Sequence, residues 1–494
     1  MALPGLSLPG LGSSATPNTQ TSAFAAPQQT TVQAPARTEN LQPQTEYRFE
    51  VPFSATYTIK LLFGHAEIFG SELAVGQPYT FSGCKGAVFT WQGCSLEMQG
   101  ESESEYVGSE TDYAIEWLNA HGMLESARDM ALQEHGGPRI LIVGSESVGK
   151  SSLVRSLAAW GVKLGRSPTV VNLDPREGLL TPPGSLTAVT VANTLDIEHV
   201  YGITPVSGPT AVPTKTPLVY SYPCATPTEK PELYKAITTR VALSVTNKLE
   251  EDTAAKRSGL ILDTPGVLND PKSNYNLLAH LVSEFSITLI LTMGSERLFN
   301  DLNRKFSNPK AGEDAPSVLR IAKPGGAVER DTQFLKQSRI KQMRQYFFGT
   351  PAIPLNPHSH SVPFSDLAVY RTKKTAAEAS AENDDEDDEY NPSLDPDAPS
   401  APPGAASAAA TPGVWFDRVT PSAAMTGGLL AIKFCPSNSE EDTVRDSAVM
   451  GFLYVSEIDE VKKRVRFLAP HPQRWGDRAL VWGGWPEAVG DLVG

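Results

Sequence analysis

One stretch, Gly144-Ser-Glu-Ser-Val-Gly-Lys-Ser-Ser152, constrains this chain more than any other because it reads G-x-x-x-x-G-K-S. A β-type apolar run leads into it, and a helical pattern of apolar residues follows it. In such a loop, backbone N–H groups and the start of the next helix hold phosphate, the lysine reaches the outer phosphates, and the serine hydroxyl binds Mg²⁺. The stretch therefore predicts a nucleotide site made of Gly144, Ser147, Val148, Gly149, Lys150, Ser151 and Ser152.

Short apolar runs alternate with helical ones around this loop, which predicts a parallel sheet covered on both faces. Two of the runs end in an acid, at Asp174 and at Asp263. Ligands bind at the carboxyl ends of parallel strands, so both acids are expected near the phosphates. Ser151 and Asp174 are the predicted ligands of Mg²⁺.

The regions on either side of this centre are rich in β signals. Six short β-like runs lie between Tyr47 and Met98, and further strand patterns follow Pro351. The predicted fold class is therefore α/β: a central P-loop NTPase sheet, a small N-terminal β-sandwich domain and a mostly β C-terminal domain. The predicted bounds are 41–111 for the first domain, 112–350 for the second, with its linker helix and a basic lid, and 351–494 for the third.

Two segments have too few apolar residues to bury a core, so we expect them to be disordered. They are residues 1–40, rich in Pro, Ala, Ser, Thr and Gln, and an insertion at about 374–413. The insertion holds seven acids between Glu382 and Glu389, half of the net charge of −14. An acidic balance argues against a general nucleic-acid binder, whose affinity depends on neutralising phosphates.

The remaining composition points to a reducing compartment, nuclear or cytosolic. The four cysteines form no C-x-x-C pair, which favours neither a zinc site nor a disulfide framework. No run approaches the length of a membrane span, and the N-terminus lacks the pattern of a signal peptide.

Taken together, the motifs resemble those of the Clp-type subunit of the pre-mRNA cleavage and polyadenylation machinery, a relative of polynucleotide 5′-hydroxyl kinases. The resemblance runs from about Glu46 to Leu480. Besides the phosphate loop, it is carried by Gly64-His-Ala-Glu-Ile-Phe-Gly-Ser-Glu-Leu73, Ala87-Val-Phe-Thr-Trp-Gln-Gly-Cys-Ser95, Leu164-Gly-Arg-Ser-Pro-Thr169, Lys323-Pro-Gly-Gly-Ala-Val-Glu-Arg330 and Arg344-Gln-Tyr-Phe-Phe-Gly349.

The resemblance implies ATP as the nucleotide, with Glu46 and Lys85 of the N-terminal domain at its adenine end. It also implies a nuclear protein whose central domain docks a segment of a Pcf-type scaffold subunit. Pre-mRNA would then be reached indirectly, through the assembled complex.

The chain departs from the pattern of active kinases at three places. Asp174 is followed by Pro-Arg-Glu where the active pattern has Val-Gly-Gln, and Val267 stands where a base-clasping Trp is expected. Arg330 keeps the first of two lid arginines, but Leu335 replaces the second. Phosphoryl transfer depends on such charges, so the sequence predicts structural ATP and no catalytic residue. Asp174 and Arg330 are the candidates if activity remains.

Two alternatives stay open at this stage. One is an active RNA 5′-hydroxyl kinase. The other is a switch-type GTPase, since Val171-Asn-Leu-Asp-Pro175 and Asp263-Thr-Pro-Gly266 resemble switch segments. Asn247-Lys248 lacks the aspartate expected of a guanine-specifying N-K-x-D, which disfavours the GTPase.

Overall fold

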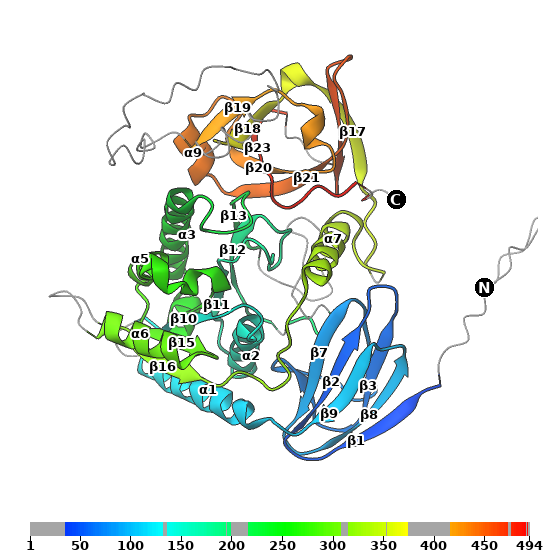
Figure 1. The fold of residues 1–494 in the computed structure, drawn as a ribbon, viewed down its shortest axis with the longest axis vertical. Helices are drawn as coiled ribbons and strands as arrows, with labels where there is room; N and C mark the ends of the chain where they lie inside the picture. Colours follow the sequence, from blue (N-terminus) through cyan, green and yellow to red (C-terminus); the bar gives the residue numbers. More distant parts are fainter. Residues whose placement is uncertain are drawn as a thin grey trace, which may run out of the picture.

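A computed structural model describes most of the chain as three domains, each built on β-sheet (Figure 1). The described residues are 35–131, 136–193, 195–198, 216–307, 315–351, 353–373, 415–472, 476–490 and 492. The predicted insertion at about 374–413 and most of the predicted tail lie outside them. No described helix is long and apolar enough to cross a membrane.

The N-terminal domain is a sandwich of two sheets, in the orders β1-β8-β3-β6 and β5-β4-β7-β2-β9. Alternating residues of both sheets fill the core between them, among them Ile59 and Leu96 of the first sheet and Phe49 and Val88 of the second. The strands are β1 (Arg37–Leu41), β2 (Thr45–Val51), β3 (Tyr57–Gly64), β4 (Glu67–Ile68), β5 (Ser71–Glu72), β6 (Pro78–Phe81), β7 (Cys84–Thr90), β8 (Cys94–Gly100) and β9 (Ser104–Gly108).

Strand β1 corrects the predicted end of the tail, because it begins at Arg37, inside the range 1–40. It pairs with β8 in antiparallel register and buries Leu41. Arg37 also forms an ion pair with Glu105 of β9. These contacts come from distant segments, so the local composition could not reveal them.

The central sheet has the order β13-β12-β11-β14-β10-β15-β16. Strands β11, β14, β10, β15 and β16 are parallel, as predicted, whereas β12 and β13 extend the sheet in antiparallel fashion. The strands are β10 (Arg139–Gly144), β11 (Thr169–Asn172), β12 (Ser185–Thr190), β13 (Leu218–Ser221), β14 (Leu260–Asp263), β15 (Leu289–Met293) and β16 (Ser317–Ile321).

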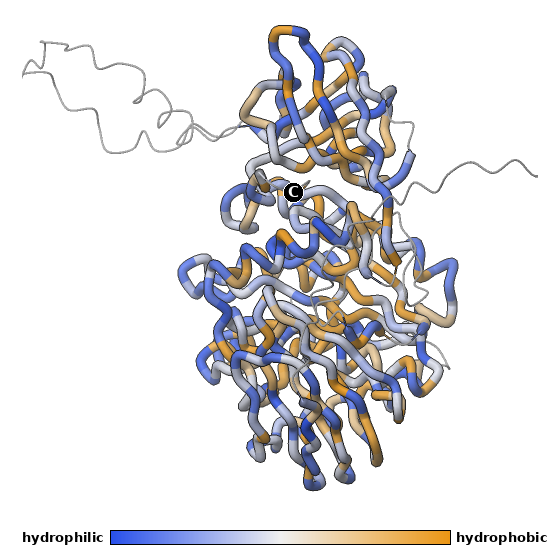
Figure 2. The backbone as a smooth tube through the Cα atoms, turned by 90° about the vertical axis from the view of Figure 1, so that its right-hand side faces the viewer, coloured by the Kyte–Doolittle hydropathy of each residue, from blue (hydrophilic) through white to orange (hydrophobic). Residues whose placement is uncertain are grey.

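Helices cover both faces of this sheet. Side chains of α1 and α2 pack with Ile140 and Ile142 on one face, and those of α3, α5 and α6 pack with Leu141 and Val143 on the other. The helices are α1 (Asp112–Met130), α2 (Lys150–Lys163), α3 (Pro231–Glu251), α4 (Thr253–Ser258), α5 (Asn276–Glu284), α6 (Glu296–Phe306) and α7 (Thr332–Phe348), with short 3-10 turns at Gly266–Asn269 and Pro271–Ser273. In Figure 2 the hydrophobic stretches of the chain, in orange, run through the interior of the domains.

The C-terminal domain is built on one sheet in the order β17-β22-β21-β20-β23-β18-β19. Its inner face shares a core with the central domain, where Tyr346 of α7 accepts a hydrogen bond from the backbone N–H of Phe452, 3.0 Å away. The elements are β17 (His358–Pro363), β18 (Ala368–Thr372), β19 (Phe416–Val419), β20 (Leu429–Pro436), α9 (Glu441–Asp446), β21 (Val449–Asp459), β22 (Arg464–Ala469) and β23 (Arg478–Trp482), with 3-10 turns at Phe364–Asp366 and Ala423–Met425.

Candidate nucleotide-binding site

The phosphate loop joins β10 to α2 in the conformation that its glycines permit. Gly149 has φ +96°, which favours glycine, and a Cβ at Gly144 would lie 2.8 Å from the carbonyl oxygen of Met293. Gly149 is the N-cap residue of helix α2, which has neither a side-chain cap nor an acid in its first turn. Its first N–H groups are therefore available to an anion, and the helix dipole favours one.

Lys150 lies at the floor of the loop. Its Nζ donates a hydrogen bond to the carbonyl oxygen of Ser145, 2.7 Å away, and burial lowers its pKa. The carboxylates of Asp263 and Asp174 act in the opposite direction and favour the charged amine. A buried ammonium beside free helix N–H groups fits the phosphates of a nucleotide.

Two carboxylates at the carboxyl ends of strands, Asp174 and Asp263, lie close enough to this lysine to act on its charge. Asp263 accepts a hydrogen bond from the Ser151 hydroxyl at 2.6 Å, and burial raises the pKa of Asp263 to about 6. Asp174 instead accepts from the backbone N–H of Arg176 at 2.9 Å, and burial raises its pKa as well. The Ser151 hydroxyl therefore contacts Asp263, whereas the sequence analysis named Asp174 as the second magnesium ligand beside Ser151. Both carboxylates line the same cavity.

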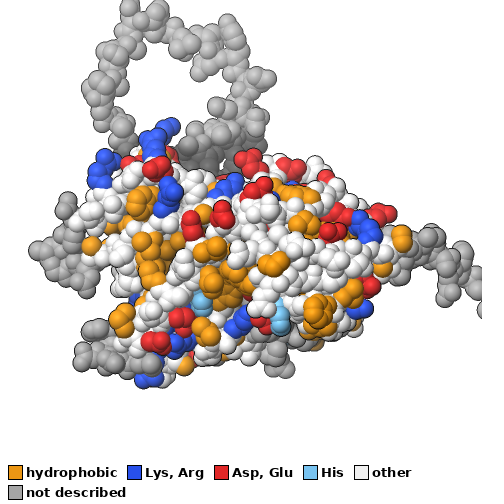
Figure 3. Space-filling view, turned by 90° about the horizontal axis from the view of Figure 1, so that it is seen from below, with side chains coloured by type: hydrophobic (Ala, Val, Ile, Leu, Met, Phe, Trp, Pro, Cys, Tyr) orange, Lys and Arg blue, Asp and Glu red, His pale blue; other side chains and the backbone are white. Residues whose placement is uncertain are grey.

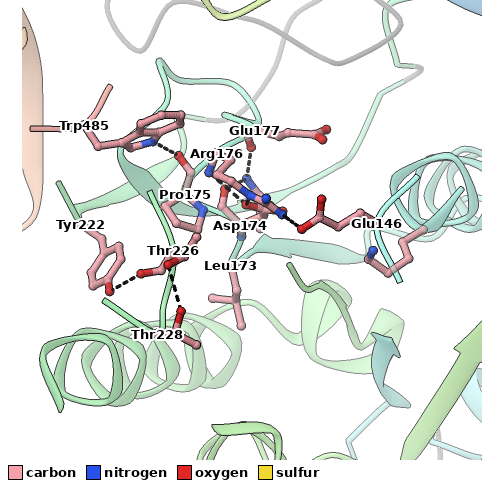
Figure 4. Close-up of polar contacts among 12 residues, drawn as sticks. Glu146, Leu173, Asp174, Pro175, Arg176, Glu177, Tyr222, Thr226, Thr228 and Trp485 are labelled. Carbon is pink, nitrogen blue, oxygen red and sulfur yellow. Dashed lines mark hydrogen bonds and ion pairs between the residues drawn. The ribbon is translucent and has the colours of Figure 1, made fainter. Parts of the chain in front are cut away.

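Charged residues next to the predicted ones form two ion pairs at the phosphate end. Arg176 donates to Glu146 at 2.7 Å (Figure 4), and Arg330 contacts both carboxylate oxygens of Glu177, one of them at 3.2 Å. Burial tends to raise the pKa of Glu177, but Arg330 outweighs it and the pKa is lowered. The sequence analysis missed Glu146 and Glu177, because their arginine partners are distant in the sequence and no local pattern indicates such pairs.

The opposite end of the cavity is built from the N-terminal sandwich. Glu46 is buried and accepts hydrogen bonds from Arg48 and from the Tyr113 hydroxyl, the latter at 2.6 Å. Lys85 pairs with Glu50 at 2.7 Å. Glu46 and Lys85 thus lie on the adjacent strands β2 and β7, on the cavity wall that faces the phosphate loop.

One cavity brings most of the predicted site residues together, although they are far apart in sequence. Its walls include Glu46, Lys85, Ser147, Gly149, Lys150, Ser151, Ser152, Asp174 and Arg330. Gly144 and Val148 are not among the lining residues, since Val148 is buried in the core behind the loop. Backbone N–H groups hold phosphate in such a loop, so the nucleotide contacts of Gly144 and Val148 stay a prediction.

The departures from the kinase pattern also have a structural place. Leu335 lines the cavity with an apolar side chain where an arginine was expected. Val267 packs against the core below the sheet and does not line the cavity. Asn247 and Lys248 are exposed on α3, also outside the cavity lining, which gives no support to a guanine-specifying role.

Each of the three domains matches the model of a known protein family. Residues 40–131 match the N-terminal beta-sandwich domain of polyadenylation factor, and residues 144–349 match the mRNA cleavage and polyadenylation factor CLP1 P-loop. Residues 355–487 match the family described as pre-mRNA cleavage complex II protein Clp1.

Full-length relatives agree with these matches. The mRNA cleavage and polyadenylation factors of Phaeosphaeria nodorum and Botryotinia fuckeliana are 42% and 40% identical to this chain, over 99% of it and 100% of each relative. The fold resembles that of Clp1p in a solved Clp1p–Pcf11p complex, with a TM-score of 0.78 and 23% identity over 91% of this chain and 98% of that one. A P-loop domain in this setting binds a nucleotide. The chain belongs to the Clp1 family of mRNA cleavage and polyadenylation factors.

Proposed function

We propose that this protein is a nuclear assembly subunit of the mRNA 3′-end cleavage and polyadenylation complex, and that Mg²⁺-ATP is its structural ligand. The observation that supports it most is the composition of the cavity. One wall belongs to the N-terminal sandwich, at Glu46 and Lys85, and the other to the phosphate loop, at Lys150. A nucleotide that contacts both walls stabilises the folded state, by about 4 kcal/mol at a thousandfold excess over Kd.

The charges of the phosphate end support a bound magnesium ion. The carboxylates of Asp174, Asp263, Glu146 and Glu177 line the cavity together with the cations Lys150, Arg176 and Arg330. A phosphate group would add further negative charge, which Mg²⁺ would offset through Ser151 and a carboxylate. Within the described residues, no group of three or more His, Cys, Asp or Glu side chains is arranged to hold a metal alone. Binding of Mg²⁺ would therefore depend on the phosphates.

The same charges support retention of ATP over its turnover. Arg330 is engaged by Glu177 and Arg176 by Glu146, so both arginines have carboxylate partners inside the chain. An arginine that acts on a transferred phosphoryl group must meet the charge that develops there. The active kinase is the alternative outcome of the test, with Asp174 and Arg330 as its catalytic groups.

The Pcf-type scaffold subunit is the proposed partner. A solved relative of the same fold is a Clp1p–Pcf11p complex, and another Pcf11p–Clp1p structure is described as explaining the loss of ATP in a glycine-to-arginine mutant. The face of the molecule in Figure 3 carries acidic and basic side chains side by side. That mixture suits protein contacts better than a direct, general attraction to RNA.

The test begins with the purified full-length protein, which is denatured so that its nucleotide can be identified. ATP is the expected product, whereas GTP or GDP would contradict the proposal. Lys150→Ala should lose the nucleotide and weaken capture by the scaffold segment, while Lys248→Ala, an exposed change on α3, should do neither. Labelled ATP with 5′-hydroxyl RNA should give no transfer. Transfer that Lys150→Ala abolishes would establish the kinase instead.

A further inference from the structure

The lid helix α7 and the segment just before it are tied to one short loop at two points. That loop, Asp174–Glu177, carries a predicted magnesium ligand and lines the phosphate end of the cavity. The first tie is the ion pair between Glu177 and Arg330, two residues before α7. The second tie runs through Arg339 in the middle of the helix and through the last described part of the chain.

Arg339 lies on the cavity side of α7. It follows Leu335 by four residues, so both side chains lie on one face of the helix, and both line the cavity. The Nε atom of Arg339 donates to both carboxylate oxygens of Glu487, at 3.0 and 3.2 Å. Its guanidinium also lies 4.6 Å from the ring centre of Trp485. Both contacts are partly shielded from water, which strengthens charge-assisted and cation–π interactions.

Trp485 completes the second tie. Its indole N–H donates a hydrogen bond to the carbonyl oxygen of Pro175, 2.9 Å away, and Figure 4 shows the ring beside the loop. The segment is held close to the central domain on both sides of the tryptophan. A Cβ at Gly184 would lie 3.1 Å from the Trp485 carbonyl oxygen, and one at Gly483 would lie 2.5 Å from the Cβ of Pro223.

We propose that Trp485 and Glu487 form a C-terminal latch, which positions Arg339 and loop Asp174–Glu177 and thereby slows the release of the bound nucleotide. The idea rests on the proposed nucleotide binding. With the latch closed, the lid is fixed to the loop at Arg330 and at Arg339. Both ties would have to open before α7 could leave the phosphate end.

The latch is not needed to attach the C-terminal sheet. That attachment is supplied by the shared apolar core, in which Tyr346 and Phe347 of α7 pack against Phe452 and Tyr454. Trp485 and Glu487 lie outside that core and make polar contacts at the edge of the nucleotide cavity. Their loss should therefore change the lid before it changes the fold.

The test measures nucleotide dissociation from the full-length protein. A fluorescent ATP analogue is bound and then displaced by excess ATP, and its rate of release is recorded. Glu487→Gln is expected to raise that rate roughly tenfold, because removing one partner of a shielded charge pair acts mainly on dissociation. Trp485→Phe removes the N–H bond to Pro175 but keeps an aromatic ring beside Arg339, so it should raise the rate less. Glu457→Gln, which breaks the exposed pair with Arg466 on the same sheet, should leave the rate unchanged.

Two further measurements separate positioning from damage. The double variant Arg339→Glu with Glu487→Arg should release the analogue more slowly than either single variant, a rescue that general unfolding would not give. Backbone amides of α7 up to Arg339 should exchange hydrogen faster in Glu487→Gln without nucleotide. Unchanged release, or failure of the reversed pair to rescue, would overturn the latch. If the wild type bound no ATP, the proposed function would fail, and unchanged amide exchange alone would then overturn the latch.

Discussion

The carboxylate of Glu67 accepts hydrogen bonds from the indole nitrogen of Trp160, 3.1 and 3.3 Å away, across the boundary between the sandwich and helix α2. The indole of Trp91 donates to the same carboxylate at 3.3 Å. Burial raises the pKa of Glu67, as expected for a carboxylate between two large rings. This contact places the N-terminal wall of the cavity relative to the phosphate loop.

Replacing Glu67 with Ala should destabilise the protein. Two indole N–H groups would lose their acceptor, which costs roughly 1–3 kcal/mol for a buried donor. Urea unfolding measures the change. Glu72→Ala on the neighbouring strand breaks only an exposed pair with Lys163 and should cost less than about 1 kcal/mol. Equal losses in both variants would mean that Glu67 has no special role at the boundary.

Lys85→Met should weaken ATP retention and leave the melting temperature of the nucleotide-free protein nearly unchanged. Lys85 is partly exposed and its partner Glu50 can be solvated, so removing the charge costs little stability. Retained nucleotide is quantified after denaturation. Lys60→Met, in the other sheet of the sandwich, is the matched control. Glu46→Gln should weaken retention too, but it also deprives the buried Arg48 of a partner. Unchanged ATP retention in the double variant at Glu46 and Lys85 would mean that the N-terminal sandwich does not bind the nucleotide.

Glu105 should make the sandwich sensitive to acid. Burial alone would raise its pKa, but hydrogen bonds from Arg37, Tyr57, Tyr47 and Ser102 lower it to about 2, from an ordinary 4.5. A depressed pKa stabilises the fold above the unfolded value, and this stabilisation is lost as pH falls from about 4.5 towards 2. The wild type should therefore unfold at higher urea than Glu105→Gln at pH 6, with a smaller difference at pH 3. A difference independent of pH would contradict the assignment.

Two glycine substitutions should have opposite effects. Gly149→Ala forces a Cβ into a left-handed conformation and should cost roughly 1–2 kcal/mol as well as nucleotide binding. Gly122→Ala, in the middle of α1 with open space around it, should instead stabilise the protein by about 0.5–1 kcal/mol. Thermal unfolding distinguishes the two signs. A neutral Gly149→Ala would mean that the loop can adopt another backbone conformation.

Sequence reasoning found the elements whose signals are local. The strands β10, β11, β14 and β15 are short apolar runs, and each was predicted close to its observed position. Helix α1 also lies where a helical pattern of apolar residues predicted it, but Ile115, Leu118 and Met123 of that pattern are exposed, and Trp117 and Leu124 are buried instead. Strand β12 was missed because Ser185, Thr187 and Thr190 make it look like a loop. Their buried hydroxyls are satisfied by partners elsewhere, such as Thr169, 3.0 Å from Thr190. Only the folded sheet supplies those partners.

The candidate site divides in the same way. Lys150 and Ser151 belong to a contiguous motif, and Asp174 and Asp263 follow from the rule that ligands bind at strand ends. In the sequence, Arg339 is only one charge of the predicted basic lid, and nothing around Trp485 indicates a role near the nucleotide. Their meaning depends on contacts across 148 and 310 residues of chain, which no periodicity encodes.

The shared core at the end of α7 has a consequence for how the nucleotide is acquired. Met343, Tyr346 and Phe347 are almost fully buried, so the second half of the lid cannot swing out while the protein stays folded. Entry and exit must then rely on bending of the first half alone, so we expect nucleotide exchange to be slow. A nucleotide taken up while the chain folds would stay with the molecule afterwards. The proportion of copies that hold ATP and not ADP would then reflect the ratio of the two nucleotides in the cell when those copies were made.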